Sequence, residues 1–276
     1  MTKRATNGFG TLLKHWRALR QQTQLDLALA TGVSARHVSF LETGRALPSR
    51  QMVITLSIAL DVPLRDRNAL MLAAGFAPAY AETRLDDARM RDARVALEAM
   101  LRRHEPYSAL VCDRHWNLVM ANAAHVEFLK LCLGTRAEGA EAYSLLPAGR
   151  FNVIDLVFDP DGFRPCIANW EFVARAMLNQ VQRAATWSGE PALHALIRKV
   201  LAYPGVPKQW RHPELEGPPG VWLPVELVNL GLPGPIRMVS TITSLQGPLD
   251  ITLQDLHVEA FYPADAETAA IIAAAG

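Results

Sequence analysis

The sequence predicts an all-α domain followed by an α+β domain, and three observations support this division. The chain has 276 residues, a length that favours two domains over one. Apolar residues follow a helical period up to about residue 75, whereas short runs suited to strands appear beyond residue 104. Residues 1–80 hold ten Lys or Arg against four Asp or Glu, and the rest of the chain holds 18 against 23. A basic part joined to an acidic part is typical of an anion-binding module attached to a module with another task.

Five short helices are predicted in the first domain, which we place at residues 1–80. From Gly8 to Gln21, apolar residues recur at three- and four-residue steps, the period of an amphipathic helix. The fourth and fifth helices are expected at residues 52–60 and 64–75. The segment FAPAYAET that follows has the proline and small residues of a linker.

The second and third helices are predicted within residues 23–45. Thr23 and Ser34 are suited to accept hydrogen bonds from free amides at the start of each helix. Gly32 lies between them, where a tight turn requires a left-handed backbone. Ala28 is small enough for a close contact between the two helices. This arrangement predicts a helix-turn-helix, whose second helix enters the DNA major groove.

The solvent-facing positions of the third helix are then Ala35, Arg36, His37 and Ser39, with Phe40 at the edge. Arg36 is the best base reader, because a guanidinium donates two hydrogen bonds to guanine. His37 and Ser39 suit a base edge or a phosphate, and simple solvation is an equal alternative for His37. Gln24 and Arg45 are expected to contact phosphates. The predicted DNA contacts are Gln24, Ser34, Ala35, Arg36, His37, Ser39 and Arg45. The alternative is a helical bundle whose basic face is accidental.

The second domain, residues 81–276, is predicted to hold a five-stranded antiparallel sheet covered on one face by helices. Strands are expected at residues 108–113, 117–122, 221–228, 235–245 and 253–262. Helices are expected at residues 82–104, from Asn122 to about Leu131, and at 152–158, 167–185 and 191–202.

The last predicted strand alternates clearly. Leu256, Val258, Ala260 and Tyr262 are expected on the buried side, with Asp255, His257 and Glu259 on the open side. The tripeptide HVE occurs at His125 and again at His257. In the strand it places His257 and Glu259 on one face, which we interpret as a solvated or interface face rather than a metal site.

A ligand pocket, where present, is expected beneath the sheet, because binding cavities are concave and mainly apolar. Trp170, Val173 and Met177 recur at helical steps, and Met238, Ser240 and Ile242 share one side of a strand. These six residues are the predicted pocket. The other side of that strand, which includes Arg237, is the alternative, and ordinary core packing explains each residue equally well. A surface ion pair is expected for Arg237.

Several function classes are disfavoured. No HExxH, GxSxG or glycine-rich phosphate loop is present, so we expect no catalytic residues, no metal and no cofactor. Cys112, Cys132 and Cys166 are too widely spaced for a zinc motif and are interpreted as buried thiols in a reducing compartment. No signal peptide and no run of about 20 apolar residues is visible, so a cytoplasmic protein without a membrane span is expected.

Two stretches resemble known families. TQLDLALATGVSARHVSFLETGRALPS is similar to the helix-turn-helix of xenobiotic-response-element repressors, kin to lambda repressor and Cro, but Ala35 stands where many relatives carry a polar residue. LVCDRHWNLVMANAA and NVIDLVFDPDGFRPCIANWEFVARAML resemble the MmyB-like regulators. That resemblance implies a PAS-like second domain that binds a small, lipid-like molecule.

Together these features predict a homodimeric regulator that binds an inverted-repeat operator in double-stranded DNA. A small apolar or fatty-acid-like ligand in the second domain is expected to control its DNA affinity. Two alternatives stay open. In the first, the second domain is an oligomerisation scaffold without an effector. In the second, it is a small-molecule enzyme tethered to a DNA-binding domain.

Overall fold

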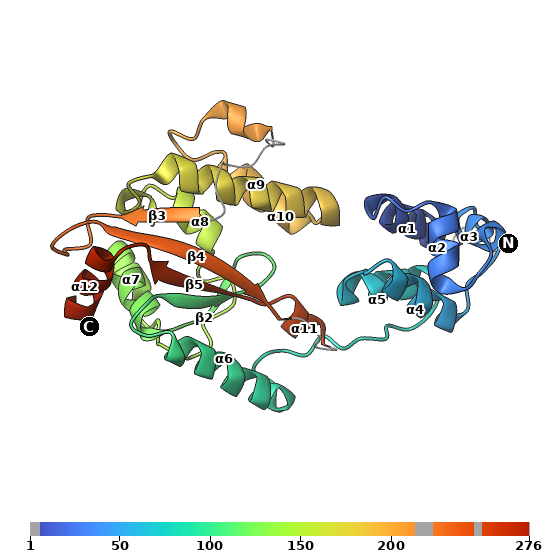
Figure 1. Cartoon of the computed structure of the whole chain (residues 1–276), viewed down its shortest axis with the longest axis horizontal. Helices are drawn as coiled ribbons and strands as arrows, with labels where there is room; N and C mark the ends of the chain where they lie inside the picture. Colours follow the sequence, from blue (N-terminus) through green and yellow to red (C-terminus); the bar gives the residue numbers. More distant parts are fainter. Residues whose placement is uncertain (1–5, 213–222, 246–249, 276) are drawn as a thin grey trace. The chain divides into compact units, whose positions relative to one another are not determined.

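The computed structural model describes residues 6–212, 223–245 and 250–275, and the chain forms two compact units (Figure 1). Unit 1 runs to Arg84 and also takes in the segment that ends at Gln254. Unit 2 holds the remainder, from Leu85 onward. Part of unit 1 is therefore contributed by a segment inserted between two strands of unit 2.

Unit 1 contains the five predicted helices. They are α1 (Thr6–Leu19), α2 (Gln24–Thr31), α3 (Ala35–Glu42), α4 (Arg50–Ala59) and α5 (Leu64–Ala73), joined by the short α11 (Ile251–Gln254). Thr23 forms a capping box with Asp26, and the Ser34 side chain accepts a hydrogen bond from the His37 amide. Gly32 has a φ of 71° and ends α2. The predicted residues thus set the starts of α2 and α3 and the turn between them.

The core of unit 1 brings α1 very close to α3. A Cβ atom on Gly10 would lie 2.5 Å from the Glu42 carbonyl oxygen, so only glycine fits this crossing. Leu27, Val38 and Leu41 are fully buried at the joint between the helices. Apolar side chains therefore fill the interface between α2 and α3.

Unit 2 is an α+β fold, as the sequence predicted. Its sheet contains β1 (Ala109–Cys112), β2 (Leu118–Ala121), β3 (Leu223–Leu227), β4 (Ile236–Ser244) and β5 (His257–Pro263). All neighbouring strands are antiparallel, in the order β2-β1-β5-β4-β3. Its α-helices are α6 (Arg91–Arg103), α7 (Ala123–Leu133), α8 (Val153–Phe158), α9 (Trp170–Ser188), α10 (Pro191–Val200) and α12 (Ala266–Ala275). Single 3₁₀ turns are η1 (Ala88–Met90), η2 (Gly134–Ala137), η3 (Arg164–Cys166) and η4 (Lys208–Arg211).

The centre of the sheet is covered on both faces, not on one. All four residues of β1 are buried, which requires cover on each side. Glu259, expected on the open side of β5, is only 4% exposed, whereas Tyr262, expected on the buried side, is 43% exposed. Leu256 and Val258 are buried as predicted, but the predictions for Glu259 and Tyr262 were wrong, because Val258 and Glu259 are both buried and burial does not alternate there.

Three boundaries also differ from the sequence prediction. Residues 82–87 are not helical, and α6 begins only at Arg91. Residues 167–169 run beside β3, where the Ala168 amide donates to the Glu226 carbonyl, so α9 starts later than expected. The last predicted strand starts at His257, because α11 takes the residues before it. Residues 221–222 of the third predicted strand lie outside the described residues.

Candidate ligand cavity and DNA-binding surface

Unit 2 contains a partly open cavity of about 660 Å³ between the sheet and helices α7, α8 and α9. This volume lies within the range of small-molecule sites, about 300–1,000 Å³. Strands β1, β3, β4 and β5 form one wall, and Figure 1 labels β4 and β5 with α7 near them. Most lining side chains are apolar, including Leu110, Phe128, Phe163, Val225 and Phe261.

Three of the six predicted pocket residues line this cavity, namely Val173 and Met177 from α9 and Met238 from β4. The other three do not. The Trp170 indole donates a hydrogen bond to the Val157 carbonyl at 2.7 Å, which fixes it in the packing between helices. Ile242 is 43% exposed, because β4 continues past the covered part of the sheet. Ser240 is half-buried and does not line the cavity, and its side chain hydrogen-bonds the Glu259 carboxyl.

Glu259 is the main polar group of the sheet wall, and sequence reasoning placed it on the wrong side. Its Oε2 atom is buried and has no hydrogen-bond partner among the described residues. Burial raises the pKa of its carboxyl to about 7, and the hydrogen bond with Ser240 opposes this effect. Near neutral pH, Glu259 therefore exists in both protonated and ionised forms.

His125, in the first turn of α7, is the main polar group of the helical wall. It is 3% exposed, and its Nδ1 lies 2.8 Å from the Ser108 hydroxyl oxygen. Its Nε2 is buried and has no partner among the described residues. Burial lowers the pKa of its imidazole to about 4, so the ring is neutral at pH 7. The two HVE motifs thus contribute His125 and Glu259 to one cavity. The repeated motif singled out these residues in the sequence, but it did not show where they lie in the fold.

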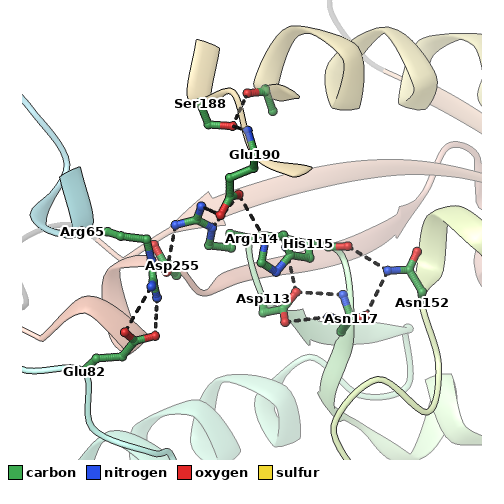
Figure 2. Close-up of polar contacts among 11 residues, drawn as sticks. Arg65, Glu82, Asp113, Arg114, His115, Asn117, Asn152, Ser188, Glu190 and Asp255 are labelled. Atoms are coloured by element: carbon green, nitrogen blue, oxygen red, sulfur yellow. Dashed lines mark hydrogen bonds and ion pairs between the residues drawn. The ribbon is translucent and has the colours of Figure 1, made fainter. Parts of the chain in front are cut away.

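A polar network holds the β1–β2 hairpin outside this cavity (Figure 2). Asp113 accepts hydrogen bonds from the amides of His115 and Asn117 at 2.8 and 2.9 Å. Glu190, at the start of α10, pairs with Arg114, and its Oε2 lies 3.1 Å from the His115 Nε2. Arg114 also lies 3.7 Å from Asp255. These contacts hold the hairpin against the start of α10, and we interpret them as structural contacts.

The cysteines are buried or half-buried, but two of them are not isolated. Cys112 is fully buried. The Sγ atoms of Cys132 and Cys166 lie 3.1 Å apart as free thiols, although 34 residues separate them in the chain. Burial and this contact raise the pKa of the Cys132 thiol well above its usual range. The Cys132 thiol is therefore neutral at pH 7.

On the DNA-binding side, α3 presents Arg36 as an exposed side chain, with His37 and Ser39 half-buried beside it. The guanidinium carbon of Arg36 lies 5.2 Å from the centre of the Phe40 ring, and that of Arg45 lies 5.9 Å from the same ring. Two cations are thereby held on one aromatic side chain at the end of the helix. Ala35 is half-buried against the core of unit 1, so it is less exposed than expected.

Gln24 has a structural partner that the sequence did not reveal. Its side-chain amide donates to Glu42 at 2.8 Å, and Arg17 donates to both oxygens of the same carboxylate at 2.6 and 3.1 Å. The side chain of Glu42 is only 3% exposed. Arg17 also donates to the Gln22 carbonyl at 2.6 Å. These bonds join α1, α2 and α3 through one buried carboxylate.

No group of three or more His, Cys, Asp or Glu in the described part of the chain has a geometry that would hold a metal ion. No helix within residues 6–212, 223–245 and 250–275 is long and apolar enough to cross a membrane.

Comparison with known proteins gives two matches. Residues 93–275 match the family model described as "MmyB-like transcription regulator ligand binding domain". Residues 13–66 match the one described as "Helix-turn-helix". No curated protein matches the chain. The longer match covers the cavity and the whole sheet, and the shorter covers α2 and α3.

Proposed function

The chain belongs to the family of MmyB-like transcription regulators, and we propose that a small apolar or fatty-acid-like ligand in unit 2 controls its affinity for DNA. It is a DNA-binding protein with a helix-turn-helix and a ligand-binding domain. In this proposal, residues 1–80 form the DNA-binding domain and residues 81–276 the ligand-binding and dimerisation domain. The proposal also places the protein in the cytoplasm.

The observation that carries the proposal is the cavity itself. A space of about 660 Å³ in unit 2 is lined mainly by apolar side chains. A core that served only as an oligomerisation scaffold would be expected to fill this space. A bound ligand explains the space.

For DNA recognition, we assign Arg36 to a base edge and Arg45 to a phosphate. Ser34 keeps its role as a helix cap, and His37 and Ser39 remain candidates for either kind of contact. Gln24 is a weaker candidate for a phosphate, since its amide already bonds Glu42. A homodimer on an inverted repeat is proposed because helix-turn-helix proteins commonly bind two half-sites as dimers.

The proposal is tested by titrating the purified full chain against genomic fragments at about 0.1 M salt with competitor DNA. Retention of particular fragments, together with a reproducible extra mass on the protein in native mass spectrometry, is the expected result. Retention of no fragment would contradict the DNA-binding part. If fragments are retained but neither a co-purifying mass nor any added apolar compound binds, the scaffold alternative is favoured.

A further inference from the structure

Two of the three cysteines form a pair that the proposed function does not use. The Sγ atoms of Cys132 and Cys166 lie 3.1 Å apart as free thiols. An S–S bond is about 2.05 Å long, so the two sulfur atoms need to approach each other by only about 1 Å to form one. The third cysteine, Cys112, lies in β1 and is fully buried.

The pair lies in the wall of the ligand cavity. Cys132 is in the last turn of α7, and Cys166 ends η3. Both cysteines pack in one apolar cluster with Phe128 and Met238, which also line the cavity. The Val228 amide, one residue past β3, donates to the Cys166 carbonyl at 2.9 Å, which ties η3 to the sheet. A bond between the two sulfur atoms would therefore fix α7 to the sheet side of the cavity.

The two thiols differ in their access to solvent. Cys132 is half-buried and follows Leu131, which is 57% exposed, whereas Cys166 is only 6% exposed. An oxidant from solvent therefore reaches Cys132 first. Burial and the contact with Cys166 raise the pKa of the Cys132 thiol, so its reactive thiolate is scarce and the reaction is slow. Such a pair stays reduced under ordinary conditions and responds to sustained oxidation.

From this arrangement we propose that Cys132 and Cys166 form a reversible oxidation site, which closes as a disulfide and fixes α7 at the cavity wall. Disulfides in cytosolic proteins are usually transient, with catalytic or redox-sensing roles. A structural zinc site needs four ligands, and no third His, Cys, Asp or Glu completes a metal-binding group with this pair in the part of the chain that the structure describes. The site goes beyond the proposed function, whereas its effect on ligand exchange rests on that function.

The oxidant is a peroxide, with hydrogen peroxide as the simplest case. The Cys132 thiolate attacks one peroxide oxygen, the O–O bond breaks, and a sulfenic acid forms while the leaving hydroxide takes up the thiol proton as water. The Cys166 sulfur then attacks the sulfenic sulfur. The S–S bond forms, the S–O bond breaks, and the oxygen leaves as a second water molecule with the Cys166 proton. The two thiols lose two electrons to the peroxide, and a dithiol reductant reverses the bond by exchange.

The site is tested on the reduced full chain with an excess of hydrogen peroxide, followed by alkylation in denaturant and peptide mass spectrometry. We expect a linked pair of peptides that contains Cys132 and Cys166, together with an alkylated, unlinked Cys112. The oxidised chain should run as a monomer on a denaturing gel without reductant. Dithiothreitol should remove the link.

The effect on the cavity is measured as the dissociation rate of the neutral dye Nile red from the oxidised and the reduced protein. Fixing α7 should slow dissociation by at least about threefold, because release requires the wall to move, and reductant should restore the rate. Cys166→Ala lacks the pair and should not respond to peroxide. Cys112→Ala is the matched control, which keeps the pair and the response. Circular dichroism establishes that each variant is folded.

The outcomes separate this inference from the proposed function. The inference is overturned if no linked peptide forms, if the link joins two copies of the chain, or if Cys132 ends as a sulfinic acid without a link. An unchanged Nile red rate in the linked protein, or an equal response in Cys166→Ala, overturns the effect on the cavity. If Nile red does not bind the reduced protein, the proposed ligand function is contradicted, and the linked peptide still decides whether the oxidation site exists.

Discussion

Glu259 is an acid buried beside apolar side chains, so the stability of unit 2 depends on pH through this residue. Burial raises the pKa of its carboxyl from 4.5 to about 7. The folded protein therefore binds this proton more tightly than the unfolded chain. The resulting stabilisation is complete below pH 4.5 and is lost as the pH rises to about 7.

The variant Glu259→Gln cannot ionise, so it should escape this loss. Between about pH 5 and pH 8, we expect its free energy of unfolding to rise relative to that of the wild type by on the order of 2 kcal/mol. Urea unfolding at both pH values measures the difference. Burial lowers the pKa of His125 to about 4, so this residue lowers the stability of the fold as the pH falls. Because both proteins contain His125, its contribution cancels in the comparison. An equal difference at both pH values would contradict the assignment.

Arg36 and Arg45 contact the same aromatic ring but are expected to play different parts on DNA. Arg36→Ala should weaken binding to the retained fragments by about 1–3 kcal/mol and relax selection at one base position. Arg45→Ala should weaken binding to all sequences alike and lower the salt dependence of the affinity by about one unit of slope. Gel-shift titrations at several salt concentrations distinguish the two patterns. If Arg36→Ala also weakened binding to all sequences alike, Arg36 would not contact a base.

At the scale of elements, the buried carboxylate of Glu42 joins the first three helices. Glu42→Ala leaves the guanidinium of Arg17, whose side chain is 13% exposed, without its partner. Removing one partner of a buried ion pair typically costs about 3–5 kcal/mol, and we expect a loss of this size in the stability of unit 1.

The matched control for Glu42 is Asp61→Asn, because Asp61 has a φ of 45°, a backbone conformation that Asn tolerates better than Ala. Asp61 pairs with Arg20 at 3.6 Å, but its side chain is 93% exposed. An exposed pair contributes about 0–1 kcal/mol, so little change is expected. Thermal unfolding of both variants measures the contrast. Equal effects would show that burial does not decide the importance of these pairs.

Local signals in the sequence predicted many elements because their causes are local. Thr23, Ser34 and Asn122 each cap the helix that follows, since a side chain of the right kind lies directly before it. The face of β5 was mispredicted because its burial depends on distant segments. The apolar α12, with α11 before β5, also escaped the sequence analysis. Cavity residues on α9 were predicted from a helical stripe, whereas Glu259 required knowledge of what covers the sheet.

At the scale of the whole molecule, the chain passes between the two units three times. The segment between β4 and β5 includes α11, which belongs to unit 1, and β5 follows α11 directly. Gln254 of α11 accepts a hydrogen bond from the Leu64 amide at 2.7 Å. No long linker thus separates the strand that carries Glu259 from α11, a helix of the DNA-binding unit, and we expect this connection to transmit the effect of a ligand.

We expect Gln254→Ala to weaken the coupling between ligand and DNA without abolishing either kind of binding. The hydrogen bond it removes fixes α11 to the start of α5, while the cavity and α3 are left unchanged. The measured quantity is the ratio of DNA affinities with and without saturating dodecanol, in the variant and in the wild type. A ratio equal to that of the wild type would exclude this route.

The central claim is that occupancy of the cavity changes DNA affinity, and the most direct test is the dissociation constant of one retained genomic fragment with and without ligand. Dodecanol and dodecanoate are each added to the full chain at saturation. With at least one of them, the constant should change by about 5–150-fold, the usual range of such coupling. The variant Val225→Trp, which fills the cavity from the sheet side, should lose the response and keep DNA binding. An unchanged constant with both compounds, despite demonstrated binding of each, would contradict the account.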